Sequence, residues 1–198
     1  MPMSDNKRII LASGSPRRKE LLTMIFERFD VLVADCEEVI TGQTPEETVK
    51  ELSQQKALAV ASGGRIKEEA VIIGADTVVS AGGEILGKPK DQEEACRMIS
   101  MLSGKTHKVC TGVTLIRTDG EGTICRQKSF AETTSVRVAE LSAEEIGEYI
   151  RTEEPYDKAG GYGIQGVFGK YIEGIEGDYN NVVGLPVHRL YVELGKMM

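Results

Sequence analysis

Apolar runs and stretches of helical periodicity alternate along this chain of 198 residues, a pattern typical of proteins that mix strands with helices. Arg8–Ser13 encloses a short apolar run and predicts a strand. Ala70–Ala75 is almost continuously apolar and predicts a strand buried on both faces. Phe29–Ala34 alternates apolar with polar positions and predicts a further strand, and Glu84–Leu86 predicts a short strand after a diglycine turn.

Polar residues that cap helices precede several of the remaining apolar stripes. A Ser, Thr or Asp side chain before the first turn accepts a backbone N–H, and a Glu three residues later caps in the reverse direction. Such pairs are Thr44 with Glu47, Asp91 with Glu94, and Ser142 with Glu145. With the periodicity they predict helices over Pro16–Ile25, Pro45–Ser62, 92–102, a segment after Ser142, and Pro186–Lys196.

The later part of the chain predicts a β-rich region. Lys105–Arg117 and Thr123–Val138 are long β-type segments around a glycine-containing turn, which predicts a hairpin. Pro155–Gly177 is rich in glycine and predicts loop with short strands, one of them at Val167–Ile172. The expected fold class is α/β, with a mixed sheet and helices on its faces. We expect one domain over residues 1–198, with lobes of roughly 1–104 and 105–198.

Composition narrows the classes of function. The formal net charge is −7, from 31 acidic and 24 basic residues, so polymeric nucleic acid is not an expected partner. The four cysteines lack metal-ligand spacing, and we expect them to be reduced and mostly buried. No apolar run is long enough to span a membrane and no secretory leader is evident, so a cytoplasmic location is expected.

Ser13–Arg18 joins the first predicted strand to the first predicted helix and has the composition of a phosphate site. Two hydroxyls, free backbone N–H groups and two guanidinium groups meet where Pro16 suits the first turn of a helix. An ordinary connection with solvated arginines explains the same six residues equally well. Because the chain is acidic overall, an anionic ligand would have to be bound by such a local cluster.

Acidic residues follow two of the predicted strands. Asp76 comes directly after the apolar run Ala70–Ala75, at the expected end of a strand, where α/β folds place ligand sites. A metal ion, a lysine, or the backbone N–H groups of a turn can each stabilise a carboxylate there. The pair Glu37 and Glu38 follows the strand Phe29–Ala34, and it is either part of a metal site or a solvated acidic loop.

Basic residues complete a set suited to phosphate chemistry. Lys56 falls on the apolar stripe of its predicted helix, so it either extends to the edge of that face or reaches into a cleft. With Arg17, Arg18, Lys88 and Lys158, it could bind phosphates opposite a divalent metal held by the carboxylates of Glu38 and Asp76. Phosphoryl transfer requires this mixture, because charge on the transferred group must be neutralised from several sides.

Two motif matches are excluded by their context. Gly161–Gly166 matches G-x-G-x-x-G, but a strand rather than a helix is expected after it, so it is not a dinucleotide-binding motif. Gly104–Thr106 resembles the end of a P-loop, but the first glycine of that motif is missing.

Six motifs, in order and over nearly the whole chain, closely resemble the Maf family of nucleoside triphosphate pyrophosphatases. The motifs are Ser13–Arg18, Gly74–Val78, Gly87–Pro89, Leu102–His107, Asp157–Gly166 and Asn181–Pro186. The resemblance implies a fold like that of the inosine-triphosphate pyrophosphatases, an elongated mixed sheet with two lobes around a central cleft. It implies hydrolysis between the α- and β-phosphates with a divalent cation, Mg²⁺ or Mn²⁺. It also implies a possible homodimer, and roles in cleaning the nucleotide pool and restraining septum formation.

Site residues carry over from the family's motifs by position. Asp76 matches the proton acceptor for the attacking water, and Glu38, preferred over Glu37, matches a carboxylate that helps hold the metal together with Asp76. The two roles of Asp76, base and metal ligand, are in tension. Phosphate-binding positions are matched by Ser13, Arg17, Arg18, Lys56 and Lys88. Positions that separate substrate groups are matched by Thr77, Gln165 and the arginines, Arg17 above all, and this set resembles the subgroup acting on dTTP and UTP.

Two alternatives stay open from the sequence. The first is a nucleotide-binding regulator of cell division with little turnover. The second keeps the fold but changes the substrate to 7-methyl-GTP or another modified nucleotide.

Overall fold

The computed structural model of the protein describes residues 7–33, 35 and 37–197. Cys36 lies outside these residues, as does Ala34, the last residue of the strand expected from Phe29. Within the described ranges, every helix is too short or too polar to cross a lipid bilayer.

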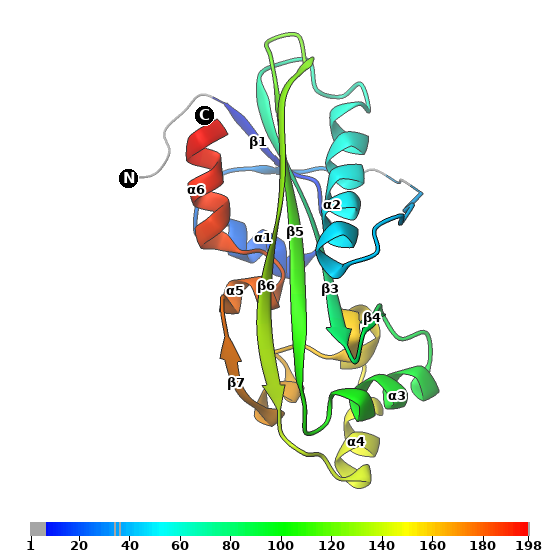
Figure 1. The fold of residues 1–198 in the computed structure, drawn as a ribbon. Helices are drawn as coiled ribbons and strands as arrows, with labels where there is room; N and C mark the ends of the chain where they lie inside the picture. The colour runs from blue at the N-terminus through cyan, green and yellow to red at the C-terminus, as the bar shows by residue number, and fades with distance from the viewer. Residues whose placement is uncertain (1–6, 34, 36, 198) are drawn as a thin grey trace. The chain divides into compact units, whose positions relative to one another are not determined.

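Seven strands in the described part of the chain form one mixed sheet (Figure 1). The strands are β1 (Arg8–Leu11), β2 (Asp30–Val31), β3 (Ala70–Ala81), β4 (Glu84–Leu86), β5 (Thr106–Thr118), β6 (Ile124–Val138) and β7 (Ile172–Glu176). Their order is β2-β1-β3-β5-β6-β7, and β4 pairs with β3 off this path. β1 is parallel to β2 and β3, whereas β4 and β7 are antiparallel to their neighbours. The expected mixed α/β class is therefore confirmed.

Helices flank these strands. The α-helices are α1 (Pro16–Leu22), α2 (Pro45–Ala61), α3 (Gln92–Leu102), α4 (Ala143–Ile150), α5 (Tyr179–Val183) and α6 (Val187–Met197). Short 3₁₀ helices are η1 (Glu154–Asp157), η2 (Ala159–Gly161) and η3 (Val167–Tyr171). The expected capping boxes of α2 and α4 are present, with Thr44 and Ser142 as N-caps. Each cap satisfies backbone N–H groups that the first turn leaves unpaired, which stabilises a helix by about 1 kcal/mol.

The chain forms two compact units, each made of separate segments. Unit 1 comprises residues 1–76, 111–132 and 184–198, and unit 2 comprises residues 77–110 and 133–183. Strands β3, β5 and β6 each contribute residues to both units, so the units cannot be contiguous halves of the sequence. They therefore differ from the lobes 1–104 and 105–198 that we expected.

In unit 1, helix α2 packs closely on β3 and β5 because two strand positions are glycine. A Cβ at Gly74 would lie 2.3 Å from the carbonyl oxygen of Ser53, and a Cβ at Gly112 would lie 2.2 Å from that of Val49. Between these backbones, a buried chain of hydroxyls links α2 to the sheet through Ser53 and Thr114, whose oxygens are 2.9 Å apart. This close approach fixes the position of α2 along β3.

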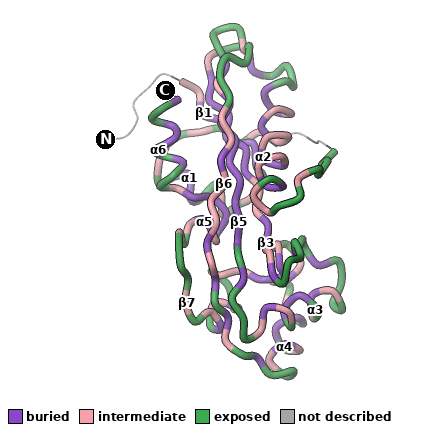
Figure 2. Tube along the Cα trace, viewed as in Figure 1, coloured by how far each residue is buried: buried purple, intermediate pink, exposed green. Residues whose placement is uncertain are grey.

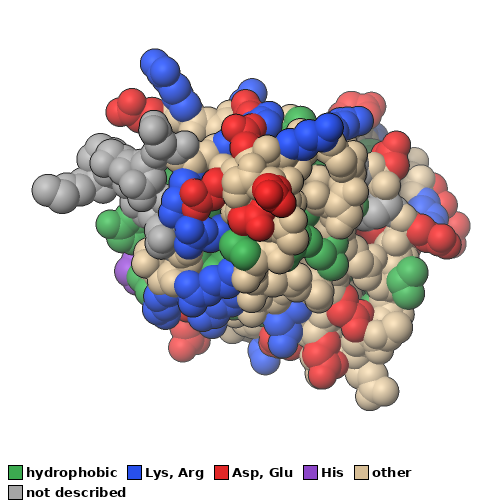
Figure 3. Space-filling view, turned by 90° about the horizontal axis from the view of Figure 1, so that it is seen from above, with side chains coloured by type: hydrophobic (Ala, Val, Ile, Leu, Met, Phe, Trp, Pro, Cys, Tyr) green, Lys and Arg blue, Asp and Glu red, His purple; other side chains and the backbone are tan. Residues whose placement is uncertain are grey.

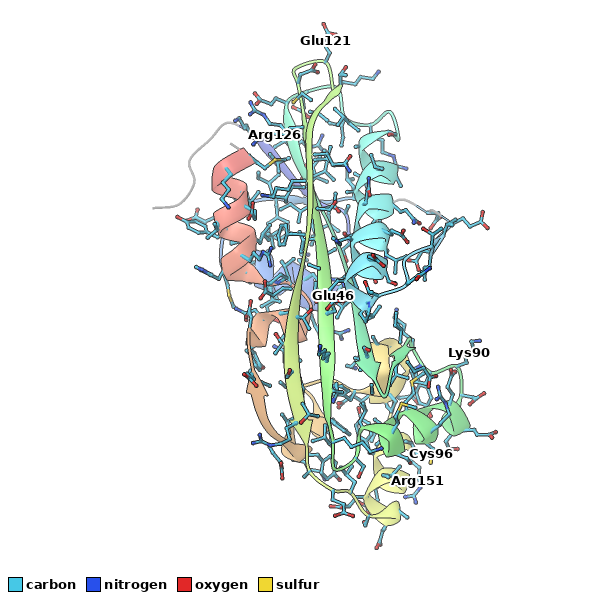
Figure 4. All side chains as sticks on the ribbon, in the orientation of Figure 1. Glu46, Lys90, Cys96, Glu121, Arg126 and Arg151 are labelled. Carbon is cyan, nitrogen blue, oxygen red and sulfur yellow. The ribbon has the colours of Figure 1, made fainter. Side chains whose placement is uncertain are left out.

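The β5–β6 hairpin of unit 1 carries Glu121 at its tip and Arg126 near the start of β6 (Figure 4). The Arg126 guanidinium donates to the carbonyl oxygen of Lys196, at 2.6 Å, and so ties β6 to the end of α6. In the view of Figure 3, several basic side chains lie next to one another at the left, and acidic side chains are more frequent toward the right.

Unit 2 has its own core, which gathers buried residues of α3, α4 and strand segments around an aromatic cluster. Phe168 lies at the centre of this cluster, with ring centroids 4.9 Å from Tyr149, 4.9 Å from Tyr162 and 5.5 Å from Tyr171. Figure 2 shows burial along much of β5, whose residues contribute to both units.

Some expected elements differ from the structure. Val167–Ile172 was expected as a strand, but Val167–Tyr171 is the 3₁₀ helix η3, and β7 begins only at Ile172. The strand expected over Phe29–Ala34 is reduced to the two residues of β2. The Glu94 carboxylate accepts the backbone N–H of Lys90, one residue before the N-cap Asp91, so the expected reciprocal capping at α3 is wrong.

The expectation of mostly buried cysteines is also wrong for the residues that the structure describes. The three described cysteines form no disulfide with one another, and only Cys110 is buried, whereas Cys96 is half-buried and Cys125 is exposed.

Candidate functional site

Ser13 and Arg18 lie together after β1, at the start of α1. The Ser13 hydroxyl accepts hydrogen bonds from the Arg18 guanidinium at 3.1 Å and from the backbone N–H of Ser15 at 3.3 Å. Arg18 also donates from Nε to the carbonyl oxygen of Gly184, at 2.9 Å. Ser15 is the N-cap of α1, and Pro16 begins the helix as expected. The guanidinium is thereby fixed by side-chain and backbone acceptors from two distant parts of unit 1.

Arg18 is a half-buried cation near a carboxylate. Burial lowers the pKa of its guanidinium below the ordinary value, while the negative charge of Asp76 opposes that shift and Arg17 adds to it. Arginine stays protonated in proteins despite such shifts, so the site contains a half-buried, partly desolvated positive charge. A desolvated guanidinium binds an anion more strongly than a hydrated one, because less water has to be displaced.

We expected Asp76 at the end of a strand, but this is wrong, because Asp76 lies within the twelve-residue strand β3. Its side chain is only 14% exposed, so an unpaired charge there would be costly. The Lys56 ammonium of α2 pairs with Asp76 Oδ1 and supplies the opposite charge. Of the three ways to stabilise this carboxylate that the sequence left open, the structure contains the lysine.

Lys56 joins two carboxylates. Besides Asp76, its Nζ contacts Glu38 Oε1 at 3.0 Å, and the Lys56 side chain is 24% exposed whereas that of Glu38 is 49% exposed. The lysine on the apolar stripe of α2 therefore turns toward β3 instead of extending into solvent. Glu38 and Asp76 come from separate parts of unit 1 and converge on a single cationic nitrogen.

The other residues expected in the site occupy varied environments. Arg17 is half-buried next to Arg18 on α1, and Thr77 is half-buried next to Asp76 on β3. Lys88 and Gln165 are exposed residues of unit 2. Their grouping with the residues of unit 1 stays a prediction.

Sequence reasoning gave no role to two residues that the structure uses. One is Gly184 of unit 1, although it lies within the motif Asn181–Pro186, and the other is Glu154 of unit 2. The carbonyl oxygen of Gly184 binds Arg18, and Glu154 makes several contacts with the segment that carries Gln165. The contact of Gly184 could not be predicted, because any residue has a backbone carbonyl oxygen that can accept a hydrogen bond. Glu154 had a weak sequence signal, since it is an acidic residue directly before the glycine-rich region.

The arrangement in unit 1 suits chemistry on an anionic substrate. Two carboxylates that share one cation can hold a divalent metal or accept a proton, and the adjacent guanidinium and hydroxyl can bind phosphate oxygens. Over the described ranges, no group of three or more His, Cys, Asp or Glu side chains is gathered as a protein-only metal site would require. A metal here would need further ligands from water and from the substrate, which is the usual coordination of Mg²⁺.

Comparison with known proteins gives consistent results. Residues 8–197 match the family model described as "Maf: Maf-like protein". A dTTP/UTP pyrophosphatase of Agathobacter rectalis is 54% identical, over 96% of this chain and 97% of the relative. A dTTP/UTP pyrophosphatase of Carboxydothermus hydrogenoformans is 51% identical, over 94% of this chain and 97% of the relative.

Similarities to solved structures are weaker. The Ham1 protein of Staphylococcus aureus is 16% identical with a TM-score of 0.48, over 97% of this chain and all of that one. A HAM1 protein of Coxiella burnetii is 14% identical with a TM-score of 0.49, over 96% and 99% of the two chains. Similarity to the family model and to the sequence relatives is therefore the stronger finding.

Proposed function

Because the chain belongs to the Maf-like protein family, we propose that it hydrolyses nucleoside triphosphates, above all dTTP and UTP, to the monophosphate and pyrophosphate. The relatives that are 46–54% identical and named dTTP/UTP pyrophosphatase support this substrate class. The observation that carries the proposal is the convergence of Glu38 and Asp76 on Lys56, with Arg18 close enough for its charge to interact with Asp76.

The residues present fit a divalent cation. Glu38 and Asp76 direct carboxylate oxygens at one point, which the Lys56 ammonium holds. Carboxylate oxygens suit Mg²⁺ and Mn²⁺, and sites that bind a metal–triphosphate commonly have only one or two protein carboxylates. We therefore assign Glu38 and Asp76 as the residues that would hold the cation. When bound, a divalent cation neutralises phosphate charge and polarises the phosphorus–oxygen bonds.

The proposed reaction is an attack of water on the α-phosphorus. The water oxygen forms a bond to that phosphorus while the bond to the oxygen bridging the α- and β-phosphates breaks. Asp76 accepts the proton of the water, and pyrophosphate leaves on the other side. Lys56 stays paired with Asp76 and Glu38 until substrate phosphates bind its ammonium, which leaves an Asp76 oxygen available to the water.

The remaining residues bind and select the substrate in this proposal. The phosphates are held by Ser13, Arg17, Arg18, Lys56 and Lys88. Gln165, with Thr77 and Arg17, reads the base, because an amide offers both a donor and an acceptor to the O4 and N3 edge of a pyrimidine. A homodimer, a cytoplasmic location, a role in cleaning the nucleotide pool and a role in septum formation stay predictions.

Substitution of Asp76 tests the proposed chemistry. Asp76→Asn keeps the size of the side chain but removes the proton acceptor, so pyrophosphate release from dTTP with Mg²⁺ should fall by roughly 100-fold or more. Glu38→Gln should raise the Mg²⁺ concentration needed for half-maximal activity, and chelation of the metal by EDTA should stop the wild-type reaction. The readout is pyrophosphate formed per enzyme, with thermal unfolding to verify that each variant is folded.

Glu37→Gln is the matched control, because it changes the neighbouring exposed carboxylate. It should keep wild-type turnover and metal dependence. Undiminished turnover in a folded Asp76→Asn variant would contradict the proposed mechanism. Tight binding of dTTP by the wild-type protein without product over hours would instead favour a nucleotide-binding regulator.

A further inference from the structure

Gln165 lies on a stretch of backbone with little intrinsic rigidity. We define the glycine-rich segment as residues 158–166 of unit 2, and four of its nine residues are glycine. Gly160 and Gly161 adopt positive φ angles of 70° and 73°, which other residues rarely adopt. Glycine loses more conformational freedom on folding than other residues, so a fixed position for Gln165 requires contacts from outside the segment.

The Glu154 carboxylate supplies such contacts at the C-terminal end of the glycine-rich segment. Its Oε2 accepts the backbone N–H of Val167 at 2.7 Å, and its Oε1 accepts that of Phe168 at 3.4 Å. The Tyr149 hydroxyl lies 3.1 Å from Oε1 and also 3.1 Å from the carbonyl oxygen of Gly161. A single carboxylate therefore closes residues 154–168 into a loop that contains Gln165.

Gly166 shows how closely this carboxylate sits against the segment. A Cβ at residue 166 would lie 2.3 Å from each carboxylate oxygen of Glu154. Any other residue at 166 would displace the Glu154 carboxylate, so the carboxylate can occupy this position only when residue 166 is glycine. Gly166 directly follows Gln165, so the Glu154 carboxylate restrains the backbone next to Gln165.

Two further hydrogen bonds hold the rest of the loop. The Lys158 ammonium donates to the carbonyl oxygen of Glu154 at 2.8 Å, so Lys158 closes the N-terminal side of the loop. The backbone N–H of Gly160 donates to the carbonyl oxygen of Gly87 at 2.9 Å. Gly87 directly precedes Lys88, and the glycine-rich segment is thus joined to the proposed phosphate-binding lysine within unit 2.

We propose that Glu154 is a positioning residue for base selection, because its carboxylate holds the backbone around Gly166 and Val167 and so fixes the orientation of Gln165. The proposal rests on the proposed function, in which Gln165 reads the pyrimidine edge. Glu154 does not touch the substrate in this account. Glu154 therefore affects the kcat/KM for one nucleotide relative to another, and not the chemical step itself.

Glu154→Gln tests the proposal, because the amide keeps one acceptor oxygen but turns an NH₂ toward backbone donors. UTP and CTP are the probes, since they differ only at the base edge that Gln165 would read. The ratio of kcat/KM for UTP to that for CTP should fall by about tenfold or more, with the loss mainly in KM for UTP. Hydrogen exchange at the Val167 amide should accelerate in the same variant.

Tyr149→Phe is a milder second variant, because it keeps the ring packed on Phe168 and removes only the hydroxyl shared by Glu154 and Gly161. It should lower the same ratio by a smaller factor. Glu153→Gln changes the exposed neighbouring carboxylate and should leave both the ratio and the exchange rate at wild-type values.

An unchanged UTP-to-CTP ratio in Glu154→Gln would overturn the proposal, whether or not exchange at Val167 accelerates. A wild-type protein that releases no pyrophosphate from UTP would instead overturn the proposed function itself. The two failures are distinguished because the second is visible before any substitution is made.

Discussion

Lys56 supplies the positive charge that the half-buried carboxylate of Asp76 requires, which the sequence alone did not establish. Asp76 carries a charge within an otherwise buried strand, and Lys56 reaches it from α2 while also binding Glu38. The residue types at all three positions were predictable as site candidates. Their pairing was not, because it depends on where α2 lies along β3, and that is fixed by contacts between residues distant in sequence.

Helix caps were the most predictable residues. Thr44 and Ser142 form the expected capping boxes because the interactions span only three residues. Asp76 was misplaced at a strand end because Asp is disfavoured within strands. Pairing of β3 with neighbours on both sides overrides that local preference.

His107 is predicted to make the stability of the protein depend on pH. Its ring is 2% exposed, with Nε2 2.7 Å from the Tyr162 hydroxyl, and burial lowers its pKa from 6.5 to about 4. Between pH 6.5 and 4 the unfolded chain binds the proton more readily, so stability falls as pH falls through that window. From pH 7 to pH 5 the contribution of His107 to the free energy of unfolding should decrease by about 2 kcal/mol.

Urea denaturation of wild type and His107→Gln at pH 7 and pH 5 measures this contribution. The decrease between the two pH values should be about 2 kcal/mol smaller in the variant than in the wild type. His188→Gln, at an exposed position of α6, should retain the wild-type decrease. Equal decreases in wild type and His107→Gln would show that His107 is not the group responsible.

At the scale of elements, the packing of α2 on the sheet organises the site. Gly74 and Gly112 let the helix backbone approach β3 and β5, and Lys56 lies on the same helix, between Ser53 and Ala59. The bounds of α2 were predictable from its caps and periodicity. The close approach of α2 to the sheet was not predictable, because a glycine in a strand can equally mark a bulge or a bend.

Gly74→Ala should therefore destabilise unit 1 and disturb the site. The added methyl group would lie 2.3 Å from a backbone oxygen of α2, and such overpacking costs about 1–3 kcal/mol. We expect the urea midpoint to fall accordingly, with a loss of pyrophosphate release, because Lys56 and Asp76 are carried by the two elements forced apart.

Gly120→Ala is the control, since Gly120 lies in the hairpin turn with no atom within 4 Å of an added Cβ. Its free energy of unfolding should stay within about 0.5 kcal/mol of wild type. If Gly74→Ala were as stable and active as Gly120→Ala, close packing of α2 would not be what positions Lys56.

At the scale of the whole molecule, the sequence predicted the mixed α/β class and most helices. The two compact units were not predicted, because strands β3, β5 and β6 pass through both, and a division along the sequence cannot represent that. The site residues divide in the same way. Ser13, Arg18 and Asp76 belong to unit 1, whereas Lys88 and Gln165 belong to unit 2.

The products formed from dTTP test the central claim most directly. Wild-type protein incubated with dTTP and Mg²⁺ should give dTMP and pyrophosphate in equal amounts, resolved by ³¹P NMR, because water attacks at the α-phosphorus. UTP should give UMP and pyrophosphate in the same way. Formation of dTDP and orthophosphate, or dTTP that stays intact under these conditions, would contradict the account.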